Sequence, residues 1–228
     1  MIASHRRLAS IAVTACCAVS ATAAFAAQAS AATLTADKAC YVNADPASGA
    51  PMVITGSGFV PGTTVQLSGG TAFANTTADA AGNVSFSTNA PELKSFSPGS
   101  KKTLLTVTGD NPDGTQTIAT VSVMSANLAV ATSPRSVKNV RKDKVTFSFS
   151  GFTPGKRIYS YYLRGKKIVA KHKFGKTSGP CGLLKEKALL YPNGRPTHDT
   201  YTVTFENSSR YNKNVFPRVT GTLSILRF

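Results

Sequence analysis

The residues of this chain best suited to binding chemistry are the basic side chains between positions 156 and 176. This stretch contains no acidic residue, and three tyrosines are interleaved with the cations. The cations are Lys156, Arg157, Arg164, Lys166, Lys167, Lys171, Lys173 and Lys176. Such a field attracts anionic cell-wall or matrix polymers and acidic lipid headgroups. Lysines outnumber arginines here, which favours diffuse phosphate attraction over base reading, so sequence-specific nucleic-acid recognition is not expected.

A β-hairpin is predicted to display these cations. The Gly165-Lys166 dipeptide lies between two runs that are rich in β-branched and aromatic residues, which is typical of a hairpin turn. In the second run, Lys167, Lys171 and Lys173 alternate with an apolar set formed by Ile168, Ala170, His172 and Phe174. Alternation along a strand places the lysines together on one solvent face. The competing interpretation is a solvated surface without a partner, with the tyrosines packed as cross-strand neighbours.

Catalytic and metal-binding constellations are not evident. The only histidines after the first thirty residues are His172 and His198. His172 alternates with apolar residues and is expected to be a packed or edge histidine. His198 lies in a turn-rich segment without a recognisable nucleophile or oxyanion hole. No Cys/His spacing suits zinc, so we expect a non-enzymatic protein with no cofactor and no metal.

A glycine-rich segment, 56–62, superficially resembles a phosphate-binding loop. Such loops precede a helix, whereas residues 63–67 are β-branched and typical of a strand. A type II turn, with Pro61 presetting φ and Gly62 at a positive φ, is the better interpretation.

The chain contains an internal duplication. Ser57, Gly58, Phe59, Pro61, Gly62 and Val65 match Ser150, Gly151, Phe152, Pro154, Gly155 and Ile158 at a constant offset of 93. Residues 106–108 match 202–204, and residues 120–123 match 222–225, in the same order. Each copy has short β-branched and aromatic runs between Gly, Pro, Asn and Asp. In the first copy, strands are expected near 39–41, 52–55, 64–67, 83–87, 103–108 and 118–123. This predicts an all-β chain of two tandem immunoglobulin-like sandwiches.

The domains are placed at 32–128 and 129–228, with residues 124–134 serving as linker and first strand. The net positive charge of the chain after the first 31 residues lies in the second domain. It contains 20 basic and 4 acidic residues, whereas residues 32–128 contain 4 basic and 6 acidic residues. The first domain is therefore near-neutral, and the second is strongly basic.

The first 31 residues are predicted to be a secretory signal peptide. Arg6 and Arg7 precede an uncharged Ala-rich stretch that ends in small residues at A-x-A spacing. Cleavage is expected between Ser30 and Thr33, which leaves a mature chain with no transmembrane helix. Three alternatives are an uncleaved anchor, a twin-arginine signal, and a lipobox ending at Cys16 that would lipidate the protein. The expected location is extracellular, in the medium or associated with the cell wall.

Two cysteines remain after the signal, Cys40 and Cys181. Disulfides persist outside the cytoplasm, so one bridge between them is the simplest pairing, and it would tether the two halves. Two separately buried thiols are the alternative.

At the G-x-G-F-x-P-G turn and at the segment TTADAAGNVSFS, the chain resembles bacterial extracellular immunoglobulin-like repeats of the IPT/TIG and neocarzinostatin-like kinds. The second half, with YSYYLRGKKIVAKHKFG and TYTVTFENSSRY, resembles C-terminal domains of secreted Gram-positive proteins without an assigned activity. The resemblance implies a secreted or surface-associated binding or structural protein. A neocarzinostatin-type carrier, with a ligand in a cleft between sheets, and a purely structural spacer are the alternatives.

Overall fold

The structure is a computed structural model, and it describes residues 31–45, 49–93, 95–140, 142–192 and 196–225. Residues 1–30 of the predicted signal peptide, with the lipobox at Cys16, lie outside these ranges. The described residues form fifteen β-strands and no helix, so none of them belongs to a helix able to cross a membrane. The prediction of an all-β chain is confirmed.

Strands β1 to β8 build the first sandwich. They are β1 (Thr33–Ala36), β2 (Tyr41–Asn43), β3 (Pro51–Ser57), β4 (Thr64–Gly69), β5 (Ala72–Thr77), β6 (Val84–Asn89), β7 (Ser100–Asp110) and β8 (Gln116–Asn127). One sheet has the order β1-β3-β6, and the other has the order β2-β8-β7-β4-β5. Alternating apolar side chains, including Tyr41, Met52, Ile54, Leu67 and Phe86, are buried between the two sheets. Two of these strands, β1 and β5, fall outside the runs expected from the sequence.

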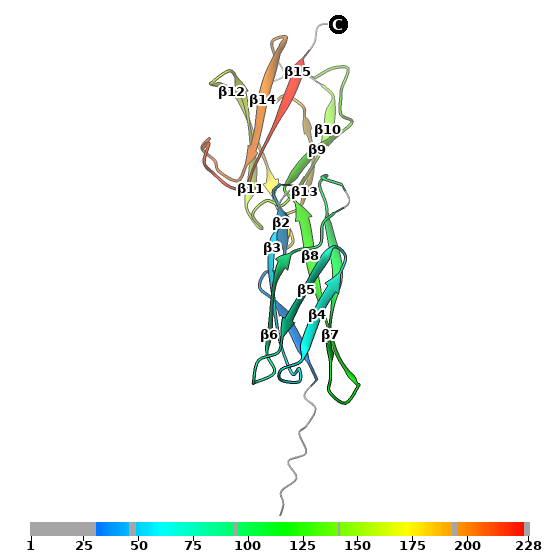
Figure 1. Cartoon of the computed structure of the whole chain (residues 1–228). Helices are drawn as coiled ribbons and strands as arrows, with labels where there is room; N and C mark the ends of the chain where they lie inside the picture. The colour runs from blue at the N-terminus through cyan, green and yellow to red at the C-terminus, as the bar shows by residue number, and fades with distance from the viewer. Residues whose placement is uncertain (1–30, 46–48, 94, 141, 193–195, 226–228) are drawn as a thin grey trace, which may run out of the picture.

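Strands β9 to β15 build the second sandwich, which lies end to end with the first (Figure 1). They are β9 (Ala129–Ser133), β10 (Lys144–Ser150), β11 (Arg157–Arg164), β12 (Lys167–Lys176), β13 (Leu184–Leu189), β14 (Asp199–Glu206) and β15 (Arg218–Ile225). The sheets have the orders β13-β10-β9 and β12-β11-β14-β15. Phe147, Phe149, Phe174 and Phe205 pack ring against ring in the core.

The duplication is visible in the backbone. Gly62 and Gly155 have φ values of 75° and 71°, the left-handed region that the predicted turn requires. The Gly62 N–H donates to the Ala78 carbonyl at 2.9 Å, and the Gly155 N–H donates to the Thr177 carbonyl at 3.1 Å. The two copies therefore share the turn and the contact that fixes it.

The strand expected near Ala39 begins two residues later. In the segment before it, the Asp37 Oδ1 accepts hydrogen bonds from the Tyr41 hydroxyl at 2.7 Å and the Val53 N–H at 2.9 Å. These bonds fix the chain as it passes from β1 in one sheet to β2 in the other. They also hold the pKa of Asp37 below its usual value, while burial together with the bond to Asp37 raises the pKa of Tyr41 to about 12.

The two sandwiches are joined without a free linker. Only Leu128 separates β8 from β9, and its N–H donates to the Asn43 carbonyl at 2.8 Å. The Ser150 hydroxyl donates to the Asn127 carbonyl at 2.6 Å. Val42 belongs to the first sandwich, yet it packs against the core of the second. The junction is therefore a packed and hydrogen-bonded interface.

The predicted disulfide spans this junction. Cys40 and Cys181 are bonded, with their Cα atoms 5.3 Å apart and a sequence separation of 141. Cys181 is almost fully buried, and its carbonyl accepts the Gly151 N–H at 2.9 Å. The bridge links the segment before β2 to the loop before β13, and so it fastens one domain to the other.

Candidate functional site

The hairpin that carries the predicted basic residues is β11 followed by β12. Its turn is Gly165-Lys166, with Gly165 at a φ of 59°, and Arg164 pairs with Lys167 on either side of it. The turn lies at the end of the second domain that is remote from the first (Figure 1). All eight predicted cations are exposed. Each strand residue rises about 3.3 Å, so the eight residues of β11 extend over about 23 Å, and the cations are spread along this length.

The predicted alternation of β12 holds from Ala170 to Phe174 and fails before it. Tyr162 pairs with Ala170 and Leu163 with Ile168, so Val169 is an extra residue in a β-bulge. Val169 consequently packs against the core, whereas Ile168, expected on the apolar face, is 41% exposed. The bulge thus moves Lys167 to the face opposite Lys171 and Lys173, so the prediction that these three lysines share one face is wrong.

Two of the three tyrosines on the hairpin are buried. Tyr162 faces the core, and its hydroxyl donates to the Leu190 carbonyl at 2.9 Å. Tyr161, on the opposite face of the sheet, packs its ring edge-on against Tyr211, and its hydroxyl donates to the Ser208 carbonyl at 2.8 Å. Burial raises the pKa of both tyrosines to about 12. Only Tyr159 keeps partial exposure, so a row of stacking tyrosines is not formed.

Lys171 pins the segment between β14 and β15 onto this outer face. Its ammonium lies 4.8 Å from the ring centre of Tyr159 and 5.3 Å from that of Tyr161, and it donates to the Ser209 carbonyl. Such cation–π contacts contribute about 0.5–1 kcal/mol each at exposed sites. Lys171 therefore has a structural role that the sequence did not reveal.

The remaining cations fall into two groups. Arg164 faces the Asp199 carboxylate at 3.8 Å, and Arg157 donates to the Phe174 carbonyl at 3.3 Å. The others have no ion pair and no side-chain hydrogen bond with any part of the chain that the structure describes; they are Lys156, Lys166, Lys167, Lys173 and Lys176. These five ammonium groups form no ion pair among the described residues, although the Glu186 carboxylate of β13 reaches the hairpin and accepts the Gly175 N–H at 2.6 Å.

A buried carboxyl beneath the same face was not foreseen. Glu206, at the end of β14, is fully buried, and its Oε1 accepts the Asn212 N–H at 3.2 Å. Its Oε2 has no partner among the described residues. Burial raises the pKa of Glu206, and the hydrogen bond from Asn212 and the attraction of Arg218, its cross-strand neighbour, oppose this only in part. No sequence pattern indicates the burial, because it depends on how segment 207–217 folds back over the sheet.

Replacing Glu206 with glutamine is expected to change the pH dependence of stability. A raised pKa means that the folded state binds the proton more tightly than the unfolded chain does. The ordinary pKa of a glutamate side chain is 4.5. As pH rises above this value, Glu206 therefore lowers the free energy of unfolding of the wild type. The free energy of unfolding of Glu206→Gln relative to the wild type should therefore increase with pH from about 4.5 toward neutrality. Urea unfolding at several pH values measures it, and a difference that does not vary with pH would contradict the assignment.

The histidines are placed largely as expected. His172 is half-buried and packs edge-on against Phe174, with ring centres 4.4 Å apart, and burial lowers its pKa. His198 is exposed at the start of β14. Within the described ranges, no group of three His, Cys, Asp or Glu side chains could hold a metal ion.

Comparison with known proteins adds little beyond the fold. No family model and no curated protein matches this sequence. Solved structures similar to the chain include a tetra-tandem repeat from the extending region of a large adhesion protein, at 16% identity and a TM-score of 0.30, covering 85% of this chain and 49% of that one. The C-terminal domain of the Streptococcus agalactiae AgI/II polypeptide BspA is 10% identical, with a TM-score of 0.34 and coverages of 84% and 98%.

A third similar structure is a Ca2+-stabilized adhesin of an Antarctic bacterium, at 15% identity and a TM-score of 0.32. It covers 86% of this chain and 48% of that one, so the chain spans about half the length of the first and third structures. At these identities and TM-scores, the binding properties of those proteins do not transfer. The function of this chain has to follow from its own residues.

Proposed function

We propose that this chain is an exported, non-enzymatic binding protein whose second domain holds anionic polymers of the envelope or matrix through the β11–β12 hairpin. The observation that carries the proposal is the set of five exposed ammonium groups that form no ion pair with any described residue. A disulfide that ties the domains together suits an oxidising, extracytoplasmic location. The packed junction suits a protein that presents this hairpin at a fixed distance from its first domain.

The chemistry of the hairpin points to repeating phosphate or carboxylate groups. Ammonium groups act as point charges and do not impose the fork geometry of guanidinium, so they follow a flexible chain of anions without reading its sequence. The cations extend along about 23 Å of hairpin, which suits a linear polymer better than a single small anion. Acidic lipid headgroups would contact the same groups at a membrane surface.

Amide chemical-shift mapping tests where the polymer binds. Titrating the 15N-labelled mature chain with inorganic polyphosphate at low salt should shift the amides of residues 156–176 first and most strongly. Those shifts should disappear as salt is raised, because binding depends on counterion release. Shifts of equal size on β13, which carries exposed Lys185 and Lys187 on the other sheet, would contradict a dedicated hairpin site.

A further inference from the structure

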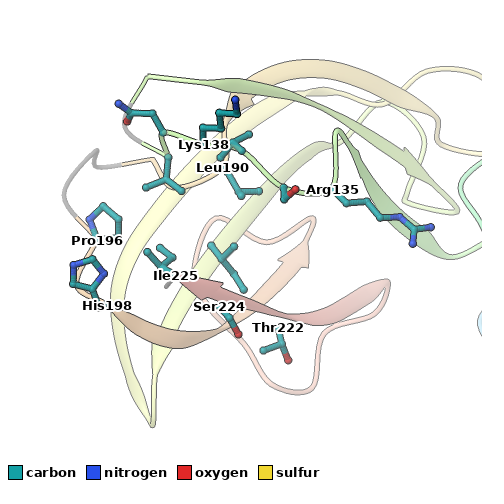
Figure 2. A pocket seen from close by; sticks show the side chains of 13 residues that line it. Arg135, Lys138, Leu190, Pro196, His198, Thr222, Ser224 and Ile225 are labelled. Carbon is teal, nitrogen blue, oxygen red and sulfur yellow. The ribbon is translucent and has the colours of Figure 1, made fainter. Parts of the chain in front are cut away.

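A groove opens into the second sandwich along the edge strand β15. Two adjoining hollows form it, one of about 450 Å3 and one of about 550 Å3, and they share Arg135, Leu190, Thr222 and Leu223 in their linings. Together they border β15 from Val219 to Ile225. Figure 2 shows the larger hollow between segment 135–140 and β15.

The groove exists because the edge formed by β8 in the first sandwich is covered differently from the edge formed by β15 in the second. In the first, β1 pairs with β3 and lies against β8, and β2 pairs with the end of β8. In the second, β9 pairs with β10 as β1 does with β3, but among the described residues no strand pairs with the outer edge of β15. The smaller hollow therefore reaches between the sheets to core side chains, including Phe147, Tyr162 and Phe205. Cavities of this size with apolar, aromatic walls are typical of small-molecule sites.

The first domain supplies part of the mouth. Phe96, Ser97 and Pro98 line the smaller hollow, and Phe96 is 44% exposed. Their loop is held in place because the side-chain amide of Asn127 donates to the Ser95 carbonyl at 2.7 Å and to the Ser97 carbonyl at 3.3 Å. An exposed aromatic ring on an anchored loop, beside an apolar hollow at a domain junction, forms a preorganised entrance.

The rim of the groove is basic. Arg135 lines both hollows, Lys138 and His198 line the larger one, and no acidic residue lines either. Arg135 has no ion pair or hydrogen bond with any described residue, so its guanidinium is available to an anion. A guanidinium fork matches the two oxygens of a carboxylate or phosphate.

We propose that this groove binds an amphipathic small molecule, with an apolar chain between the sheets and an anionic head at Arg135. None of the eight hairpin cations lines either hollow, so the site is distinct from the polymer site proposed above. The apolar walls extend to the core, and so they suit an alkyl chain better than a peptide strand, which would engage mainly the backbone edge of β15.

The absence of tryptophan makes the test direct. Phe96→Trp places a single indole at the mouth, and dodecanoate below its micelle concentration is the probe. We expect a saturable blue shift of the indole emission with dodecanoate. Dodecyltrimethylammonium, which has a similar chain and the opposite charge, should bind at least about tenfold more weakly.

Two further variants in the Phe96→Trp background separate the head contact from the chain contact. Arg135→Glu should weaken dodecanoate binding at least about tenfold, whereas Lys142→Glu, the same charge change at an exposed residue that lines neither hollow, should not. Val130→Phe should block binding by filling the smaller hollow, and thermal unfolding would verify that each variant folds.

Three results would each overturn the proposal. The first is that dodecanoate causes no saturable shift of the indole emission, and the second is that both surfactants bind equally well. The third is that Arg135→Glu and Lys142→Glu weaken dodecanoate binding equally. An acetylated peptide of alternating valine and glutamate that shifts the emission where dodecanoate does not would assign the groove to strand addition along β15, which also overturns it.

Discussion

Replacing both Cys40 and Cys181 with serine is expected to lower the free energy of unfolding by about 3–5 kcal/mol. The bridge closes a loop with a sequence separation of 141, and in the chain-entropy description a long loop loses more freedom in the unfolded state than a short one. The change should appear in urea unfolding of the mature protein, as a lower midpoint than that of the oxidised wild type.

The same substitution should affect how the two domains unfold. With the bridge present, the junction formed by Val42, Leu128 and Ser150 keeps the two cores coupled. Without it, we expect two separable transitions, detectable by calorimetry. Reduction of the wild type in denaturant provides the matched control, since it breaks the bond without changing a residue. Unchanged stability of the serine variant would contradict a structural role for the bridge.

Reversing the free charges of the hairpin should produce the largest change in binding. The quadruple variant Lys166→Glu, Lys167→Glu, Lys173→Glu and Lys176→Glu is expected to bind polyphosphate at least about a hundredfold more weakly than the wild type at about 50 mM salt. The slope of log affinity against log salt should become shallower, by about 0.7 to 0.9 for each phosphate that the variant no longer neutralises. Isothermal titration at several salt concentrations measures both quantities.

Lys171 is left unchanged in that variant for a structural reason. It holds Ser209 and lies over two tyrosine rings, so its replacement would also release segment 207–217 from the sheet. The four chosen lysines are exposed and have no such contact in the described structure, so circular dichroism and the unfolding midpoint should stay close to those of the wild type. A folded quadruple variant that binds as tightly as the wild type would contradict the proposed site.

Sequence patterns were sufficient for those parts of the fold that depend on local chemistry. The G-F-x-P-G turns, the Gly165-Lys166 hairpin and the all-β class follow from residues that need a positive φ or a β-branched neighbour, and the structure confirms them. The disulfide followed from counting cysteines under the assumption of export. These inferences depend on few residues at a time, and for that reason they succeed.

The features that were missed depend on long-range packing. The bulge at Val169 is set by the partner strand, and the burial of Tyr161 and Glu206 is set by segment 207–217 folding over the sheet. The groove along β15 arises because no described strand pairs with its outer edge as β2 pairs with β8, a difference that no alternation pattern encodes. The basic residues were found by composition, but the distinction between the engaged Lys171 and the free Lys173 required the three-dimensional structure.

The most direct test of the central claim compares two double variants with the same net charge. Lys166→Glu/Lys167→Glu changes the hairpin, and Lys185→Glu/Lys187→Glu changes exposed residues of β13 on the other sheet of the same domain. On a polyphosphate column, the hairpin variant should elute at clearly lower salt than the β13 variant, which should elute close to the wild type. Elution of both variants at the same salt would show that attraction depends only on total charge, and the hairpin would then not be a binding site.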